Sequence, residues 1–174
     1  MIRQNSISRF FKHMVSNVRQ VRKHFSETAL NRIESAIAQA EAAYEGEIFF
    51  IVEAGLHPLE IIHKKTPRKR AIELFSLFKV WDTEHNTGVL IYLLLADRDV
   101  EIVADRGIHL HVGNAEWERI CHLMELKFKL GEFEAGVLQG IAEISAELAK
   151  HFPLADEPLA GLNKNEVSNK PLVI

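Results

Sequence analysis

Four oxygen-bearing side chains are the residues of this sequence best suited to chemistry. Asp82, Glu84 and Asn86 alternate along the polar loop 81–87, and Asp105 ends an apolar segment further along the chain. Carboxylate and amide oxygens are the ligands that a hard divalent cation such as calcium takes, and the bound charge relieves the repulsion between the carboxylates. These residues therefore predict a divalent-cation site if the fold brings them together. A loop that is acidic only because it is solvated is the alternative.

The hairpin beside this loop decides whether the side chains meet. An apolar strand over 89–96 (VLIYLLLA) is followed by a turn and by a second strand over 100–105 (VEIVAD). A two-residue turn at 97–98 places Asp105 opposite Leu90. The polar loop then enters the first of these strands at the edge where the second one ends. We therefore expect the loop asparagine and Asp105 to lie within one coordination shell.

Histidine and cysteine offer weaker candidates. His109 and His111 alternate, and His122 follows about a helix away, which is a weak zinc pattern because three ligands must converge; surface histidines are the alternative. Cys121 is the only cysteine, so the sequence has neither an internal disulfide nor a CxxC zinc motif. Its neighbours at helical spacing are apolar, which favours a buried side chain over a reactive thiol.

A cluster of cations in residues 64–70 (KKTPRKR) opens a predicted helix. Backbone N–H groups at a helix N-terminus favour anions, so a phosphate or acidic-lipid contact and a merely solvated helix face are both open. Aromatic residues do not alternate with these cations, which argues against a nucleic-acid partner. The motifs of nucleophilic, P-loop and dinucleotide-binding enzymes do not occur, so no catalytic residue and no organic cofactor site is assigned.

Charge is distributed unevenly along the chain. Residues 1–24 carry six Lys or Arg and no Asp or Glu, although the net charge is −3. Apolar residues recur at helical spacing over 7–23 with the cations between them, which predicts a basic amphipathic helix. We expect this helix to pack against its own domain or a copy of it. A helix on a membrane surface, or a docking arm, is the alternative.

The remaining periodicity predicts an α/β fold in the order α-α-β-α-β-β-α-α. A second helix over 26–44 is followed by a strand over 47–54 and by helices over 66–78, 114–130 and 132–150. The hairpin makes the sheet mixed, and the helices are numerous enough to sandwich it. Because the first strand runs parallel to the second in a βαβ unit, Glu45 and Glu47 start at the same edge as the polar loop.

Three segments follow from these patterns: the basic helix 1–24, an α/β domain over 25–152, and a loose tail over 153–174 that is rich in proline and poor in periodicity. No apolar run approaches the roughly 20 residues of a membrane span, and the N-terminus lacks the apolar block of a secretory signal. We therefore expect a cytoplasmic protein whose membrane contact is at most peripheral, through residues 7–23.

The central part of the chain resembles the TPM domain family. The resemblance lies in residues 81–92 (WDTEHNTGVLIY) and 100–108 (VEIVADRGI), with a polar loop, an entry to an apolar strand that contains Asn and Gly, a hairpin, and a strand ending near a glycine. In this chain Thr87 separates the Asn from the Gly. The resemblance covers about residues 25–152.

This resemblance implies a mixed sheet between helices, binding of divalent cations such as calcium, and an acid-phosphatase activity that is disputed. The positions that match the acidic crevice of the family are Asp82, Glu84, Asn86 and Asp105. Three functions are therefore open: a divalent-cation-binding interaction module serving a protein partner or a membrane-protein assembly, a metal-dependent phosphatase acting on phosphomonoesters, and a structural or partner-binding protein that needs no metal. The substrate, the partner and the oligomeric state are not determined by the sequence.

Overall fold

A four-stranded mixed sheet forms the centre of the fold, in the order β3-β2-β1-β4. The computed structural model describes residues 6–154 and 166–174. The strands are β1 (Glu47–Glu53), β2 (Gly88–Leu94), β3 (Asp99–Ala104) and β4 (Leu172–Val173). β1 is parallel to both β2 and β4, and β3 is antiparallel to β2. The predicted mixed sheet is confirmed.

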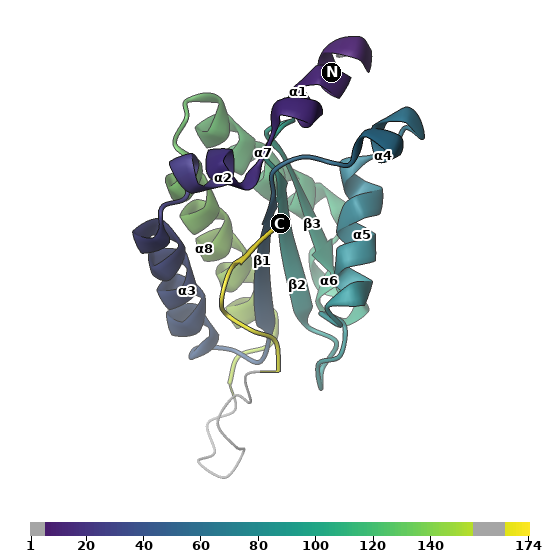
Figure 1. Cartoon of the computed structure of the whole chain (residues 1–174). Helices are drawn as coiled ribbons and strands as arrows, with labels where there is room; N and C mark the ends of the chain where they lie inside the picture. Colours follow the sequence, from purple (N-terminus) through teal and green to yellow (C-terminus); the bar gives the residue numbers. More distant parts are fainter. Residues whose placement is uncertain (1–5, 155–165) are drawn as a thin grey trace.

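Helices cover both faces of this sheet, which confirms the predicted α/β fold. The helices of the described residues are α1 (Ser6–Val15), α2 (Val18–His24), α3 (Glu27–Glu41), α4 (Pro58–Ile62), α5 (Pro67–Leu77), α6 (Arg106–Val112), α7 (Asn114–Lys129) and α8 (Phe133–His151). In Figure 1, α3 and α8 lie on one side of β1 and β2, and α5 lies on the other. None of the described helices is both long and apolar enough to cross a membrane.

The continuous apolar runs of β1 and β2 are explained by burial on both faces. Every residue of the two strands is buried, and alternate side chains enter different cores. Ile48 and Phe50 pack with the helices α3, α7 and α8, whereas Phe49 and Ile51 pack with α4 and α5. This alternation follows from the two-residue period of a strand.

The hairpin register differs from the one predicted. β2 and β3 pair so that Leu90 lies opposite Val103 rather than Asp105. The turn contains four residues, because the N–H groups of Leu95 and Ala96 donate to carbonyls at the end of β1, at 2.9 and 3.1 Å. These two residues therefore extend the parallel ladder instead of pairing with β3. Asp105 therefore lies two positions from the predicted Leu90, opposite the start of β2. Its N–H donates to the Gly88 carbonyl there at 2.9 Å.

The N-terminal segment is two helices rather than the single one predicted over 7–23. The chain breaks between α1 and α2, where the Asn17 side chain accepts from the N–H groups of Arg19 and Gln20 at 3.0 and 3.3 Å. Such a side chain satisfies backbone donors at a helix start and favours a new helix there. Val21 and Phe25 are fully buried in the core, so the predicted packing against the domain holds for α2.

Two short helices were not predicted. α4 begins with a capping box between His57 and Glu60, and α6 begins at Asp105, whose carboxylate accepts from the Arg106 N–H. α6 is joined to α7 by Gly113, which adopts a φ of 77°, so Asn114 opens α7 without capping it. Helices of this length carry too few apolar residues for periodicity to detect.

The expectation of a loose tail over 153–174 is wrong for residues 166–174. β4 pairs with β1, the Ile174 N–H donates to the Val52 carbonyl at 3.0 Å, and the Val167 side chain is only 8% exposed. A strand of two residues has no detectable period, but it satisfies part of the open edge of β1. Residues 155–165 lie outside the described part of the chain.

Ending the chain after Leu154 should therefore lower the free energy of unfolding, by about 2 kcal/mol or more for the burial of Val167 alone. The exposed edge of β1 should also promote self-association. Urea denaturation and size-exclusion chromatography measure both effects. Lys170→Gln, an exposed position of the same segment, is the control. An unchanged unfolding midpoint in the shortened chain would show that this segment does not stabilise the sheet.

Candidate functional site

Asn86 and Asp105, the central pair of the predicted ion site, are brought to one place by Arg106. The Arg106 Nε donates to Asn86 Oδ1 at 3.3 Å, and the Arg106 N–H donates to Asp105 Oδ1 at 2.7 Å. The loop that carries Asn86 lies directly on the start of α6, because a Cβ on Gly107 would lie 2.4 Å from the His85 carbonyl oxygen. Only a glycine allows this approach.

Asp82 and Glu84, the other two predicted ligands, are exposed on the same loop. The Glu84 N–H donates to Glu166 Oε2 at 3.2 Å. Within residues 6–154 and 166–174, no group of three or more His, Cys, Asp or Glu side chains is close enough together to hold a metal ion. The structure thus places the four predicted residues on adjoining segments without gathering their carboxylates.

Glu47 lies in the same row of the sheet as Asp105. Glu47 pairs with Gly88 across β1 and β2, and Gly88 in turn lies opposite Asp105. Glu47 is only 1% exposed, and burial raises its pKa to about 7. Its Oε2 atom and the Asp105 Oδ2 atom are both buried without a hydrogen-bond partner in the described structure. Two carboxylate oxygens therefore lack the partners that buried polar atoms normally have.

Glu41 is a further buried carboxyl at this edge, and sequence reasoning missed it. Its oxygens accept from the Ile48 N–H at 2.8 Å and from the Asn169 side chain at 2.7 Å. Burial raises the pKa of Glu41 to about 8. Glu41 follows Ile33 and Ile37 at helical spacing on the apolar face of α3, and this position was the signal that could have revealed it.

Residues 166–169, which precede β4, cross these acidic groups. The Glu166 N–H donates to Glu47 Oε1 at 3.3 Å, while the Glu166 carboxylate accepts from the backbone of Glu84. Together with the Asn169 contact to Glu41, this places residues 166–169 over the site. We call Glu41, Glu47, Asn86 and Asp105 the acidic edge.

A comparison with sequence families matches the TPM domain over residues 18–147, about three quarters of the chain. The chain belongs to the TPM domain family. The fold is similar to that of the BA42 protein from the psychrophilic bacterium Bizionia argentinensis, which was solved by NMR. The TM-score is 0.73 at 28% identity, and the alignment covers 86% of this chain and 94% of that chain. No curated protein matches this chain.

The weaker candidates form no metal site among the described residues of this TPM domain. His109 accepts from the Trp117 indole at 3.2 Å, and His111 stacks on His151 with ring centroids 5.0 Å apart. The described residues thus show no zinc cluster around His109, His111 and His122. Cys121 packs against the core, and burial raises its pKa to about 12, which matches the predicted apolar role.

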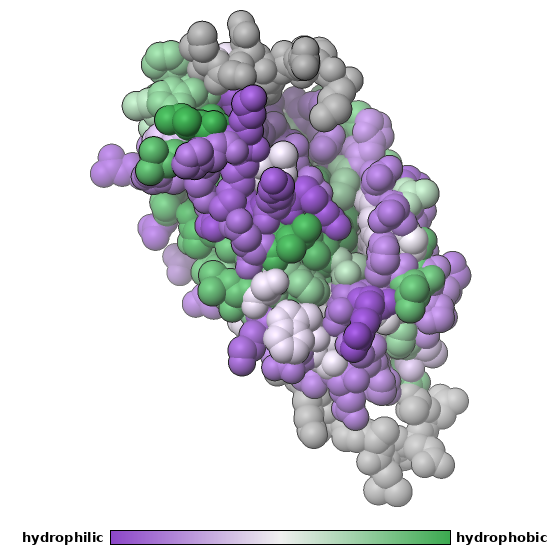
Figure 2. Space-filling view, turned by 90° about the vertical axis from the view of Figure 1, so that its right-hand side faces the viewer, coloured by the Kyte–Doolittle hydropathy of each residue, from purple (hydrophilic) through white to green (hydrophobic). Residues whose placement is uncertain are grey.

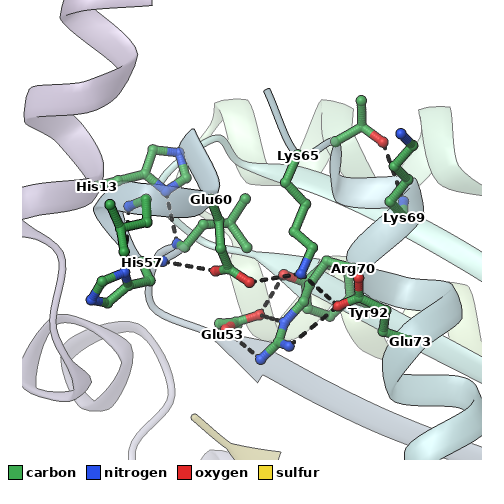
Figure 3. Close-up of polar contacts among 12 residues, drawn as sticks. His13, Glu53, His57, Glu60, Lys65, Lys69, Arg70, Glu73 and Tyr92 are labelled. Atoms are coloured by element: carbon green, nitrogen blue, oxygen red, sulfur yellow. Dashed lines mark hydrogen bonds and ion pairs between the residues drawn. The ribbon is translucent and has the colours of Figure 1, made fainter. Parts of the chain in front are cut away.

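Three of the five cations in residues 64–70 are paired with carboxylates rather than available to an anion. Lys65 contacts Glu60 at 2.7 Å and Glu73 at 2.6 Å, and Arg68 lies 3.5 Å from Glu101. Figure 3 shows Lys65, which lies between α4 and α5, with its partners Glu60 of α4 and Glu73 of α5. The proposed anion contact at this helix start is therefore left with Lys64 and Lys69 alone.

Arg70 makes the most buried of these pairs. Two of its nitrogens donate to the two oxygens of Glu53, each at 2.9 Å, and the Tyr92 hydroxyl donates to the same carboxylate at 2.7 Å (Figure 3). Glu53 is 7% exposed, and its partners come from β2 and α5. This fully paired carboxylate ties α5 to the sheet and has a structural role.

Replacing Arg70 by Met should lower the free energy of unfolding by about 3 kcal/mol, because Glu53 is then left buried without its cation. Arg119→Met is a matched control, since Arg119 contacts Glu116 and Glu143 on the surface with 46% of its side chain exposed. Its loss should cost less than about 1 kcal/mol. Equal losses in chemical denaturation would contradict the structural role given to the Glu53 pair.

The raised pKa values of Glu41 and Glu47 also predict a pH dependence of stability. Both pKa values rise above the ordinary 4.5, to about 8 and about 7. The folded state therefore binds protons more tightly than the unfolded one, and stability falls as the pH rises from about 5 to about 8.

Glu47→Gln should weaken this dependence, because it removes a carboxylate that must ionise while buried. Above pH 7 the variant should unfold at a higher temperature than the natural chain. Glu118→Gln, at an exposed position, is the control and should leave the slope unchanged. Thermal unfolding followed at several pH values measures the effect, and an identical slope in Glu47→Gln would count against the buried ionisation.

Proposed function

We propose that this TPM domain is a divalent-cation-binding interaction module whose ion site centres on Asp105 and Asn86. The observation that carries the proposal is the Asp105 Oδ2 atom, which is buried and has no hydrogen-bond partner in the described structure. Arg106 links Asp105 to Asn86, because its backbone N–H donates to the other oxygen of Asp105 and its side chain donates to the Asn86 amide oxygen. A buried anionic oxygen of this kind is stabilised by a cation.

The donor set fits calcium better than zinc. Asp105 supplies a carboxylate and Asn86 an amide oxygen, and hard oxygen ligands suit calcium, whereas zinc favours nitrogen and sulfur. Asp82 and Glu84 supply further carboxylates from the exposed part of the loop. The Arg106 guanidinium donates to the Asn86 oxygen that would bind the ion, and its positive charge opposes a cation at that oxygen. Arg106 therefore competes with the cation for Asn86.

The ion would change the surface that the module offers to a partner. Asp82, Glu84 and His85 are exposed on the loop that carries Asn86, and His85 Nε2 lies 3.0 Å from a Glu45 oxygen. Neutralising the acidic edge would fix this loop and alter its charge. A protein partner, such as a component of a membrane-protein assembly, could recognise the ion-loaded loop.

A metal-dependent phosphatase is the second candidate for the same site, because a bound ion polarises a phosphoryl group and activates water. The geometry favours the module. Glu47, the carboxyl of the acidic edge whose pKa lies nearest neutrality, is almost fully buried beneath the Glu166 backbone. A general acid or base has to reach its substrate, and this carboxyl is covered.

Calorimetric titration of the full chain with calcium, magnesium and zinc tests the proposal. Calcium should bind, and Asp105→Asn should weaken its affinity by about tenfold or more. Asp99→Asn, which changes a carboxyl at the opposite end of β3, is the matched control and should retain binding. The absence of calcium binding would overturn the proposal. Hydrolysis of a phosphomonoester that is lost in Asp105→Asn would instead favour the phosphatase.

A further inference from the structure

Large apolar side chains are exposed at the end of the sheet opposite the acidic edge. Phe11, Met14 and Val15 of α1 are 60%, 56% and 62% exposed, and Leu59 and Ile62 of α4 are 59% and 61% exposed. The two helices lie against each other at the upper end of the molecule in Figure 1. Figure 2 shows hydrophobic and hydrophilic side chains side by side on the upper part of its face. Apolar surface contributed by two separate helices marks an interaction site.

The face of α1 that is turned toward the domain fixes the orientation of this helix. The His13 side chain is 4% exposed; its Nδ1 accepts from the Leu56 N–H at 2.9 Å, and its Nε2 lies 3.1 Å from an Asp97 oxygen. Arg9 contacts the other oxygen of Asp97 at 2.9 Å, and Phe10 packs against the core. The helix is therefore anchored through one face, and its exposed apolar side chains are held away from the domain.

The segments next to this apolar surface carry exposed cations. Lys12, Arg19, Arg22, Lys23, Lys64 and Lys69 are exposed, and none of them forms an ion pair with a carboxylate of the described residues. The carboxylates that lie among them, Asp97 and Glu60, are already paired with Arg9, His13 and Lys65. This end of the molecule thus combines exposed apolar side chains on α1 and α4 with unpaired cations on α1, α2 and the residues around the start of α5.

A cavity of about 470 Å³ adjoins α1 between the two N-terminal helices and the β2–β3 turn. Its lining includes three cations, Lys12, Lys23 and Arg98, the Phe133 ring, and Asp97, whose carboxylate is paired with Arg9 and His13. The Arg98 guanidinium lies over this ring, 5.9 Å from its centroid. Lys12 and Val15 belong both to the cavity and to the exposed face of α1, so the basic cavity and the apolar surface are continuous. A lipid phosphate group has the charge and size to enter it.

We propose that this end of the molecule docks on an anionic phospholipid bilayer. The apolar residues Phe11, Met14, Val15, Leu59 and Ile62 enter the boundary between headgroups and acyl chains, and the exposed cations contact lipid phosphates. We call these residues and cations the docking end. An apolar face with Lys and Arg beside it is the composition of helices that lie on membrane surfaces, whereas protein interfaces are depleted in Lys.

Docking in this orientation leaves the acidic edge directed away from the lipid. β2 runs from the polar loop to the turn near the cavity, and its seven residues span roughly 20 Å. The proposed ion site therefore stays accessible to a partner while the protein is bound to a membrane. The docking end does not depend on that ion site.

Sedimentation of the full chain with lipid vesicles tests the proposal. The chain should bind vesicles made of equal parts phosphatidylcholine and phosphatidylglycerol, and high salt should release it. It should not bind vesicles of phosphatidylcholine alone. Lys12→Gln with Lys23→Gln should lower the partition coefficient about fivefold for each cation removed. Phe11→Ser with Met14→Ser should lower it by about tenfold or more.

The matched control is Leu77→Ser with Leu110→Ser, which changes two leucines that are 70% and 82% exposed on α5 and α6. The control should bind as the natural chain does. If Phe11→Ser with Met14→Ser loses its thermal unfolding transition, Leu59→Ser with Ile62→Ser on α4 is used in its place to test the apolar contact. Equal binding to neutral vesicles, equal loss in the control, or dimerisation through this end without vesicle binding would each overturn the proposal.

Discussion

The parallel pairing of β1 with β2 is the interaction on which the rest of this TPM domain depends. It runs without interruption from Glu47 and Gly88 to Glu53 and Leu94, and both strands are buried on both faces. Parallel neighbours need a crossover rather than a tight turn, and two apolar faces need a layer of helices each. The position of α4 and α5, and the need for α3, α7 and α8 on the other side, follow from this constraint.

The same pairing also separates the two ends of the molecule. Both strands begin at the acidic edge and end near α1 and α4, so loops at the start of β1 and β2 meet each other and never meet the N-terminal helices. Two glycines then bring the polar loop against the sheet. A Cβ on Gly88 would lie 1.8 Å from the Val80 carbonyl oxygen, and Gly107 allows a similar approach at His85. This close packing holds Asn86 beside the start of α6.

Buried carboxylates at the two ends of β1 show how a structural group differs from a functional candidate. Glu53, at one end, accepts from Arg70 and Tyr92 and is fully paired. Glu47, at the other end, keeps one oxygen without a partner in the described residues, as does Asp105. Satisfied buried networks stabilise a fold, whereas unsatisfied buried atoms require an explanation such as an ion. The proposed function rests on this contrast.

The sequence by itself determined the helices and strands that have a clear period. The helices predicted over 26–44 and 66–78 begin at Ser26 and Thr66, whose side chains accept from backbone N–H groups at the starts of α3 and α5. The continuous apolar run over 89–96 is typical of a strand that is buried on both faces, as β2 is, and the block around Asn86 and Asp105 identified the TPM family. These features are local, because capping and periodicity depend on residues a few positions apart.

Only the tertiary structure decided the hairpin register, the pairing of β4 and the environment of the carboxylates. The register changed because β1 competes with β3 for Leu95 and Ala96, and β4 exists because β1 has an open edge. Glu41 and Glu47 became buried through contacts with Asn169 and Glu166, which are more than a hundred residues away in the chain. No local pattern records such contacts, since they form only once the sheet has assembled and offers its edge to the C-terminal segment.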